Sequence, residues 1–409
     1  MHPLLYIIAG IIVFNYVLER ILDYLNDKNQ SDTLPTELAG IYDEEKYKKS
    51  RQYHKEKTRL SFITETLSFV IILVFIFIKG FGLLSNYMEA YIHNPIWLAL
   101  AYFGVLMLAG YISSLPFTLY DTFVLEQKYG FNKTTPKTFI FDTLKSFLLA
   151  VVLGCTLGYF LLWLIMDLKE SFWIYAWIIA SVFSLLLNMF YSSLIIPIFN
   201  KLSPLQEGEL KRKIEEYAAK VNFPLANVFV IDGSKRSTKG NAFFSGIGRK
   251  KKIVLYDTLI SNHTEEELVG VLAHEVGHFK KRHIITGLIL SVIQMGITLY
   301  IMSWFVFNKE LSIALGADSW KLHINLIAFG MLYEPIGMII GLFMNILSRK
   351  HEYEADAWAA QTADKTAFKQ ALIKLSVDNL SNLQPHPAYV FFHYSHPPVL
   401  ARLRAMDEG

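Results

Sequence analysis

Long apolar stretches that alternate with polar segments dominate this chain. Seven of them reach or approach the length of about 20 residues that a helix needs to cross a hydrocarbon layer of roughly 30 Å. They cover residues 3–21, 62–83, 96–117, 147–166, 172–199, 284–307 and 324–347. The pattern therefore predicts a multi-pass membrane protein dominated by α-helices, with seven transmembrane helices. The alternative is that one or two stretches are buried core helices or re-entrant segments.

The composition agrees with a membrane protein. Hydrophobic residues occupy 53% of the 409 positions and charged residues only 18%, which is too apolar for an ordinary soluble protein of this size. We therefore expect the lipid bilayer to be a partner. The first stretch lacks a preceding basic segment and a small-residue cleavage site, so it is expected to be a retained anchor.

Lysine and arginine residues gather in alternate loops. The loop 23–61 carries eight of them, and the next loop, 84–95, carries none. Under the positive-inside rule the amino terminus lies outside, whereas segment 200–283 and the tail from residue 348 both lie in the cytoplasm. This alternation accounts for the net charge of +3, so no nucleic-acid partner is predicted.

The cytoplasmic segment 200–283 has its own secondary-structure signals. Apolar positions spaced as on one helix face predict an amphipathic helix over 208–221, and short β-branched runs predict strands at 228–231 and 253–256. Thr264 followed by Glu267 has the form of a capping box at the start of another helix. We thus expect a water-facing domain that contains a small β-sheet.

The most informative motif is His274-Glu275-Val276-Gly277-His278, in the middle of that last helix. Residues four apart share a helix face, so His274 and His278 can bind one metal ion while Glu275 points at a water molecule beside it. The motif predicts a catalytic Zn²⁺ and peptide hydrolysis, with Glu275 as the base that takes a proton from the water.

A catalytic zinc site needs a third protein ligand, and the tail after the seventh stretch offers His351, Glu352 and Glu354. Glu352 and Asp356 are four apart on one helix face, so Glu352 can bind the metal while Asp356 orients a zinc histidine through its second nitrogen. Glu354 points away from that pair. The alternative is a solvated acidic helix start. Two spans separate His278 from Glu352, which returns both segments to one side of the membrane.

Several further motifs resemble the type I CAAX prenyl protease family, which consists of integral-membrane zinc endopeptidases. They include Leu115-Pro116-Phe117, Tyr129-Gly130-Phe131-Asn132-Lys133, Pro197-Ile198-Phe199-Asn200-Lys201, Asn241-Ala242-Phe243-Phe244, and Ser395-His396-Pro397-Pro398 with Arg402. The resemblance implies seven helices that enclose a chamber, a cytoplasmic zincin-like domain, one Zn²⁺ per chain, and cleavage near the carboxyl terminus of protein or peptide substrates that include prenylated ones.

The resemblance also implies roles for single residues. His396 and Arg402 would be catalytic: His396 would donate a hydrogen bond to the oxyanion, and Arg402 would either position His396 or bind the substrate carboxylate. Asn241, Ala242 and Phe243 would bind the substrate backbone as an added strand. The chain departs from the family at Lys239-Gly240, where His-Ser is frequent. The alternative function is that of a general quality-control metalloprotease of the heat-shock type, a class that usually has fewer spans.

These expectations divide the chain into a five-span membrane domain (1–199), a first catalytic segment (200–283), two further spans (284–347) and a second catalytic segment (348–409). Compact loops and the absence of a retrieval signal in the last residues favour a bacterial inner membrane over the endoplasmic reticulum.

Overall fold

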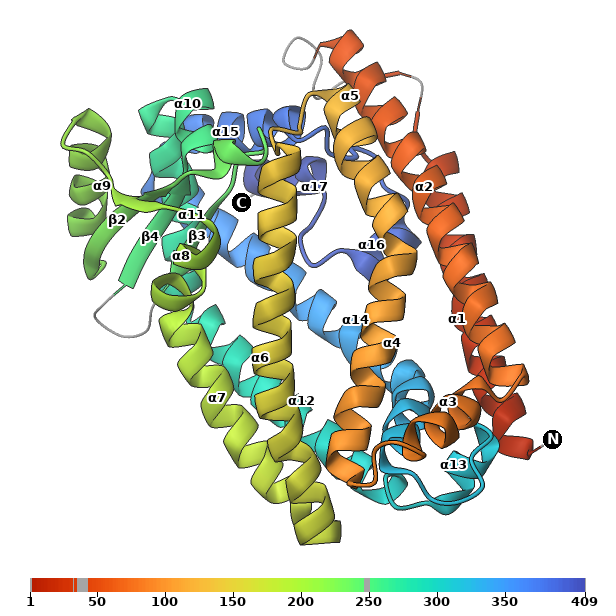
Figure 1. Cartoon of the computed structure of the whole chain (residues 1–409). Helices are drawn as coiled ribbons and strands as arrows, with labels where there is room; N and C mark the ends of the chain where they lie inside the picture. The colour runs from red at the N-terminus through yellow and green to blue at the C-terminus, as the bar shows by residue number, and fades with distance from the viewer. Residues whose placement is uncertain (1, 32, 35–42, 246–250, 409) are drawn as a thin grey trace.

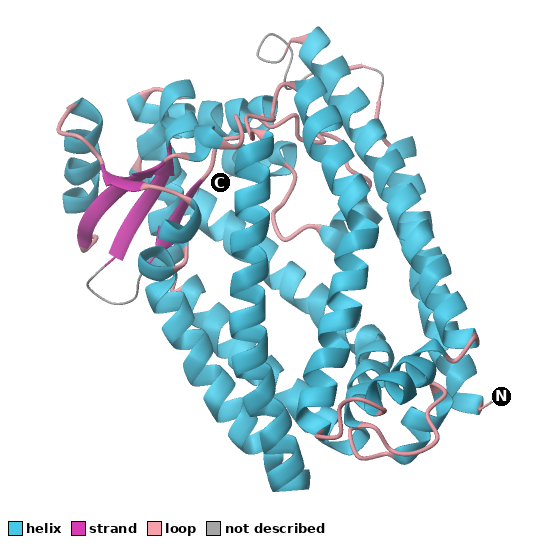
Figure 2. Cartoon of the chain, viewed as in Figure 1, coloured by secondary structure: helices cyan, strands magenta, loops and turns pink. Residues whose placement is uncertain are grey.

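The computed structural model describes residues 2–31, 33–34, 43–245 and 251–408. Its architecture is a set of long helices with a small β-sheet attached near one end (Figures 1 and 2). The long helices are α1 (Pro3–Lys28), α2 (Glu44–Phe77), α4 (Pro95–Tyr120), α6 (Pro136–Leu168), α7 (Phe172–Leu194), α12 (His283–Phe305) and α14 (Leu322–Thr362).

Six helical runs in the described residues are long and apolar enough to cross a membrane. One of them, Pro136–Phe199, has 64 residues and contains two helices, α6 and α7, which contact each other. The chain reverses between them at a short 3₁₀ turn (Lys169–Ser171), where Lys169 has φ 48°. With this hairpin counted as two crossings, the six runs together account for the seven predicted spans.

The seven helices form a closed ring. In chain order each long helix contacts the next, from α1 to α14, and α14 contacts α1. Only 6 to 22% of the residues in the most apolar window of each run are buried. In the middle of α4 every residue from 107 to 114 is exposed, so all faces of two helical turns lack close packing. We interpret this part of α4 as lining the internal space of the ring on one side and facing lipid on the other.

Close packing is concentrated at the two ends of the ring. At the end opposite the sheet, here called the far end, α3 (Gly80–Glu89) and α13 (Lys309–Ala314) fill the space between the helix ends. Gly82 of α3 lies directly against the backbone at Gly316, where an added Cβ would come within 2.0 Å of the carbonyl oxygen. The far end is therefore a packed floor beneath the internal space.

Two predicted boundaries were wrong at this level of detail. The stretch 62–83 is not one helix, because α2 ends at Phe77 and Lys79 adopts a left-handed conformation that starts α3 in a new direction. The stretch 324–347 does not end before the tail. Instead α14 continues for 41 residues to Thr362, about 62 Å at 1.5 Å per residue. One rigid helix thus runs from the far end into the catalytic segment.

The end of the ring that carries the sheet, here called the site end, holds the water-facing elements. The sheet has the order β1-β2-β4-β3, with β2 and β4 parallel and the outer pairs antiparallel. The predicted strands and the predicted amphipathic helix are confirmed as β2, β4 and α9. The elements are β1 (Leu202–Pro204), α9 (Glu209–Lys220), β2 (Leu225–Ile231), β3 (Ala242–Ser245), β4 (Lys251–Tyr256), α10 (Asp257–Asn262), α11 (Glu265–Lys280), α15 (Lys365–Asp378), α16 (Pro387–His393) and α17 (Val399–Glu408).

Candidate active site

Helix α11 presents the two motif histidines to α14. Its start is fixed by the predicted capping box, in which the Glu267 backbone N–H donates to the Thr264 hydroxyl at 3.3 Å and the Thr264 N–H donates to the Glu267 carboxylate at 2.9 Å. An added Cβ at Gly277 would lie 3.0 Å from the backbone of Ala355 on α14. The absence of a side chain there lets the two helices pack backbone to backbone, with His274 and His278 facing α14.

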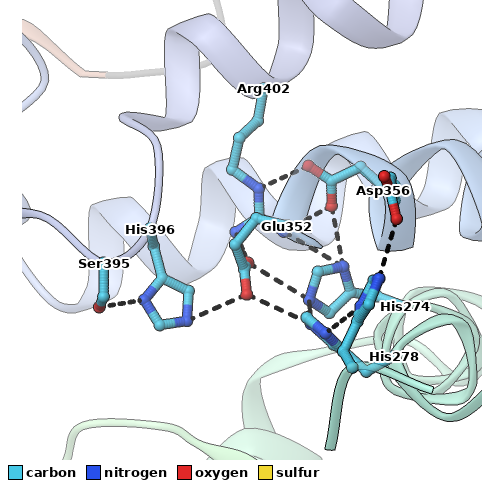
Figure 3. A network of polar contacts seen from close by, with 9 residues as sticks. His274, His278, Glu352, Asp356, Ser395, His396 and Arg402 are labelled. Atoms are coloured by element: carbon cyan, nitrogen blue, oxygen red, sulfur yellow. Dashed lines mark hydrogen bonds and ion pairs between the residues drawn. The ribbon is translucent and has the colours of Figure 1, made fainter. Parts of the chain in front are cut away.

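The structure brings His274, His278 and Glu352 together (Figure 3). These three residues are called the metal group below, because they are the predicted zinc ligands. The two Nε2 atoms are 3.2 Å apart, His278 Nε2 is 3.2 Å from one Glu352 oxygen, and His274 Nε2 is 3.5 Å from the other. Ligands on a tetrahedral zinc ion with bonds of about 2.0–2.1 Å lie about 3.3 Å from one another. The three side chains therefore have the spacing of zinc ligands.

The hydrogen bonding of Glu352 also fits a metal. The residue is 3% exposed, yet its Oε2 atom accepts no hydrogen bond. Its two ion-pair neighbours, His274 Nε2 at 3.5 Å and Arg402 Nη1 at 3.6 Å, are too distant for hydrogen bonds. A buried carboxylate oxygen that accepts no hydrogen bond is costly unless a closer cation compensates it. The Oε2 atom lies beside the His274 ring. Two imidazoles and one carboxylate are a donor set that suits Zn²⁺.

Asp356 contacts His274 on the side away from the metal group. One carboxylate oxygen is 2.8 Å from His274 Nδ1, and both oxygens accept hydrogen bonds from Arg402, at 2.6 and 2.7 Å. Burial alone would lower the pKa of Arg402, but the hydrogen bonds that Arg402 donates to the Asp356 carboxylate, together with its negative charge, outweigh burial and raise that pKa. Arg402 thus holds Asp356 in place through Nε and Nη2, while its Nη1 atom lies 3.6 Å from Glu352 Oε2.

The remaining predicted catalytic residues lie around the metal group. Burial raises the pKa of the Glu275 carboxyl above its usual value, which makes it a stronger base. His396 Nε2 lies 3.3 Å from Glu352, and its Nδ1 lies 2.9 Å from the Ser395 hydroxyl. When Ser395 donates to Nδ1, Nε2 carries the proton and directs it into the site (Figure 3).

Asn241, Ala242 and Phe243 lie at and just inside the start of β3, which is one of the two edge strands of the sheet. One edge of β3 pairs with β4, and the strand also contacts α11. The structure therefore offers an edge strand close to the helix that carries His274 and His278.

Open space leads to the site from the ring. A cavity of 460 Å³ is lined by His396 and Arg402, and one of 650 Å³ lies between α1, α2 and α4. Both are lined by His54, Asn382 and Tyr394, so they adjoin. The space between α2 and α4 therefore adjoins a cavity that is lined by two of the predicted site residues, His396 and Arg402.

The sequence analysis gave no role to His283, which the structure places beside the metal group. Its Nδ1 atom is 3.0 Å from His278 Nδ1, and its Nε2 atom is 2.9 Å from Glu354. The available signal was its position five residues after His278, directly beyond the end of α11, where a chain reversal can bring it back against that ring.

Comparisons with known proteins agree with this architecture. Residues 23–201 match the family described as CAAX prenyl protease N-terminal, five membrane helices, and residues 204–409 match peptidase family M48. The CAAX prenyl protease 1 homologue of Arabidopsis thaliana is 36% identical, over 99% of this chain and 98% of that protein. CAAX prenyl protease 1 of Saccharomyces cerevisiae is 34% identical, over 98% of this chain and 94% of that protein.

A solved structure extends the likeness to three dimensions. The crystal structure of S. mikatae Ste24p superposes with a TM-score of 0.93 at 33% identity, and the match covers 100% of both chains. The family models cover both the membrane part and the part that holds the metal group. The chain therefore belongs to peptidase family M48, among the CAAX prenyl protease 1 homologues.

Proposed function

We propose that this protein is a membrane-embedded zinc metalloendopeptidase that hydrolyses peptide bonds near the carboxyl terminus of protein or peptide substrates, including prenylated ones of the CAAX type. One observation carries the proposal: three potential ligand atoms, one each from His274, His278 and Glu352, lie within 4.8 Å of one another, and Glu275 directly follows His274 on α11. Family membership supports the same reaction.

One zinc ion per chain would be held by His274, His278 and Glu352. When bound, it supplies a Lewis acid that lowers the pKa of a water from about 15.7 toward about 7. Glu275 takes the proton from the attacking water and then passes it to the leaving amine. The raised pKa of its carboxyl supports the first of these steps, since a more basic carboxylate accepts a proton more readily.

His396 is proposed to donate a hydrogen bond to the oxyanion that develops on the scissile carbonyl. Support comes from its Nε2 atom, 3.3 Å from Glu352 and thus beside the metal group. Arg402 acts indirectly: it fixes Asp356, which in turn fixes the ring of His274.

The substrate backbone is proposed to add to the free edge of β3, at Asn241, Ala242 and Phe243. Backbone hydrogen bonds to an edge strand give affinity without demanding particular side chains. The contact between β3 and α11 supports this arrangement, because a strand added there lies beside the helix that bears Glu275.

The CAAX activity named for the relatives favours this function over general quality control, and so does the match to a five-helix membrane domain. The test uses purified protein and paired carboxyl-terminal peptides with and without a prenyl group, with products located by mass spectrometry. We expect cleavage near the carboxyl terminus, and a kcat/KM about tenfold higher for the prenylated peptide for every two CH₂ groups buried. Cleavage scattered along unrelated peptides would instead favour quality control.

The site end is proposed to face the cytoplasm, because it lies at the same end of the ring as the basic loops. The bacterial inner membrane stays a prediction, and the relatives named above come from a plant and a yeast.

Cysteine labelling tests this orientation in a Cys155→Ala background, since Cys155 is the one cysteine in the sequence. A cysteine at Asn86 should react with an impermeant reagent in intact cells. Cysteines at Lys49 and Glu408 should react only after permeabilisation. Labelling of Asn86 and Glu408 from the same side would refute the orientation.

A further inference from the structure

Glu354 lies on the side of α14 opposite Glu352 and Asp356, and it is linked to the metal group through His283. Glu354 lies two residues from both Glu352 and Asp356, so its side chain points about 200° away from theirs around the helix axis. It does not reach the metal group itself. Its Oε2 atom is 2.9 Å from Nε2 of His283, whose Nδ1 atom is 3.0 Å from Nδ1 of His278.

The hydrogen atoms in this chain of contacts can be assigned without conflict. If Nε2 of His278 binds the metal, its Nδ1 carries a proton and donates it to Nδ1 of His283. That nitrogen then accepts, so the other nitrogen of His283 carries a proton and donates it to the Glu354 carboxylate. Each nitrogen is either a donor or an acceptor, and the negative charge lies on the Glu354 carboxylate.

The backbone holds His283 in this position. Arg282, between α11 and α12, has φ 60°, a left-handed conformation that is uncommon for a residue with a long side chain. This reversal brings His283 back against the ring of His278. His283 is 7% exposed, and the ring of His351 stacks on it at 3.9 Å with 8° between the planes. The His283 ring is therefore held by the chain reversal and by the stacked ring of His351.

We propose that Glu354 and His283 are positioning residues for His278, and that they fix its ring and strengthen its bond to the metal through two successive hydrogen bonds. The inference rests on the metal site of the proposed function. In this arrangement each motif histidine is held by a different carboxylate of α14. Asp356 contacts His274 directly, and Glu354 acts on His278 through His283. A carboxylate paired in this way makes an imidazole a better metal ligand.

The test measures zinc affinity by competition with a chelator in the full-length protein. Loss of an outer hydrogen-bond partner costs about 10- to 100-fold in metal affinity, and we expect the low end for Glu354→Ala because one imidazole intervenes. Glu354→Gln, which keeps an accepting oxygen, should recover part of the loss. Glu354 is about one-third exposed, so its replacement should leave folding intact.

The matched control is Glu266→Ala, which removes another exposed, ion-paired carboxylate, from the zinc-motif helix itself. It should leave zinc affinity unchanged. The Co²⁺-substituted protein gives a second measurement, because its visible absorption depends on ligand geometry and should change in Glu354→Ala only. Wild-type affinity and an unchanged spectrum in Glu354→Ala would overturn this inference alone. Failure of the wild-type protein to bind zinc would overturn the proposed function.

Discussion

Replacing Glu275 with glutamine is expected to reduce peptide hydrolysis by about 10²- to 10⁴-fold while zinc stays bound, because a general base contributes about that much to the rate. Glutamine has nearly the same shape but cannot accept a proton from water. Cleavage rate and zinc content should be measured on the same purified sample.

This result would separate the base from the ligands, since Glu275 is not one of the three grouped residues. A Glu275→Gln protein that had lost its zinc would show that the role assignment is wrong. A protein that kept its zinc and wild-type activity would show that another group takes the proton.

Glu352→Ala should abolish stable zinc binding and activity together. The change leaves two imidazoles, and a catalytic zinc site uses three protein ligands. Elemental analysis after dialysis against a weak chelator should give close to one zinc per wild-type chain and much less per variant chain.

Asp407→Ala is a suitable control, because Asp407 is a carboxylate that is ion-paired with Lys369 at 2.7 Å, far along the tail from Glu352. It should retain zinc and activity. Full zinc occupancy in Glu352→Ala would mean that the third ligand is a different residue.

Local spacing explains why much of the site could be predicted from the sequence. His274 and His278 are four apart within α11, and Glu352 and Asp356 are four apart within α14, so the helical repeat alone puts each pair on one face. The capping box at Thr264 is equally local. The helical spans followed from length and hydrophobicity.

Contacts between distant segments could not be predicted in this way. The loop between α15 and α16 is fixed at Leu380, whose carbonyl lies 3.0 Å from the Ser50 hydroxyl and 2.6 Å from His54 Nε2. These α2 residues precede Leu380 by more than 300 positions. No periodic pattern in either segment indicates that pairing.

The link from Glu354 to His278 was missed for a related reason. Helical spacing correctly predicted that Glu354 lies on a different face of α14 from Glu352. It could not predict that His283 links Glu354 to His278. The path exists because Arg282 turns the chain back at the end of α11. A single backbone conformation of this kind has no signature in hydrophobic periodicity.

The most direct test of the account is an anomalous difference map from crystals of the zinc-loaded protein, recorded at the zinc absorption edge. We predict one peak per chain, about 2.0–2.2 Å from Nε2 of His274, Nε2 of His278 and a carboxylate oxygen of Glu352. A peak centred instead on His283 and Glu354, or no peak at the three grouped residues, would contradict the metal site on which the proposed function rests.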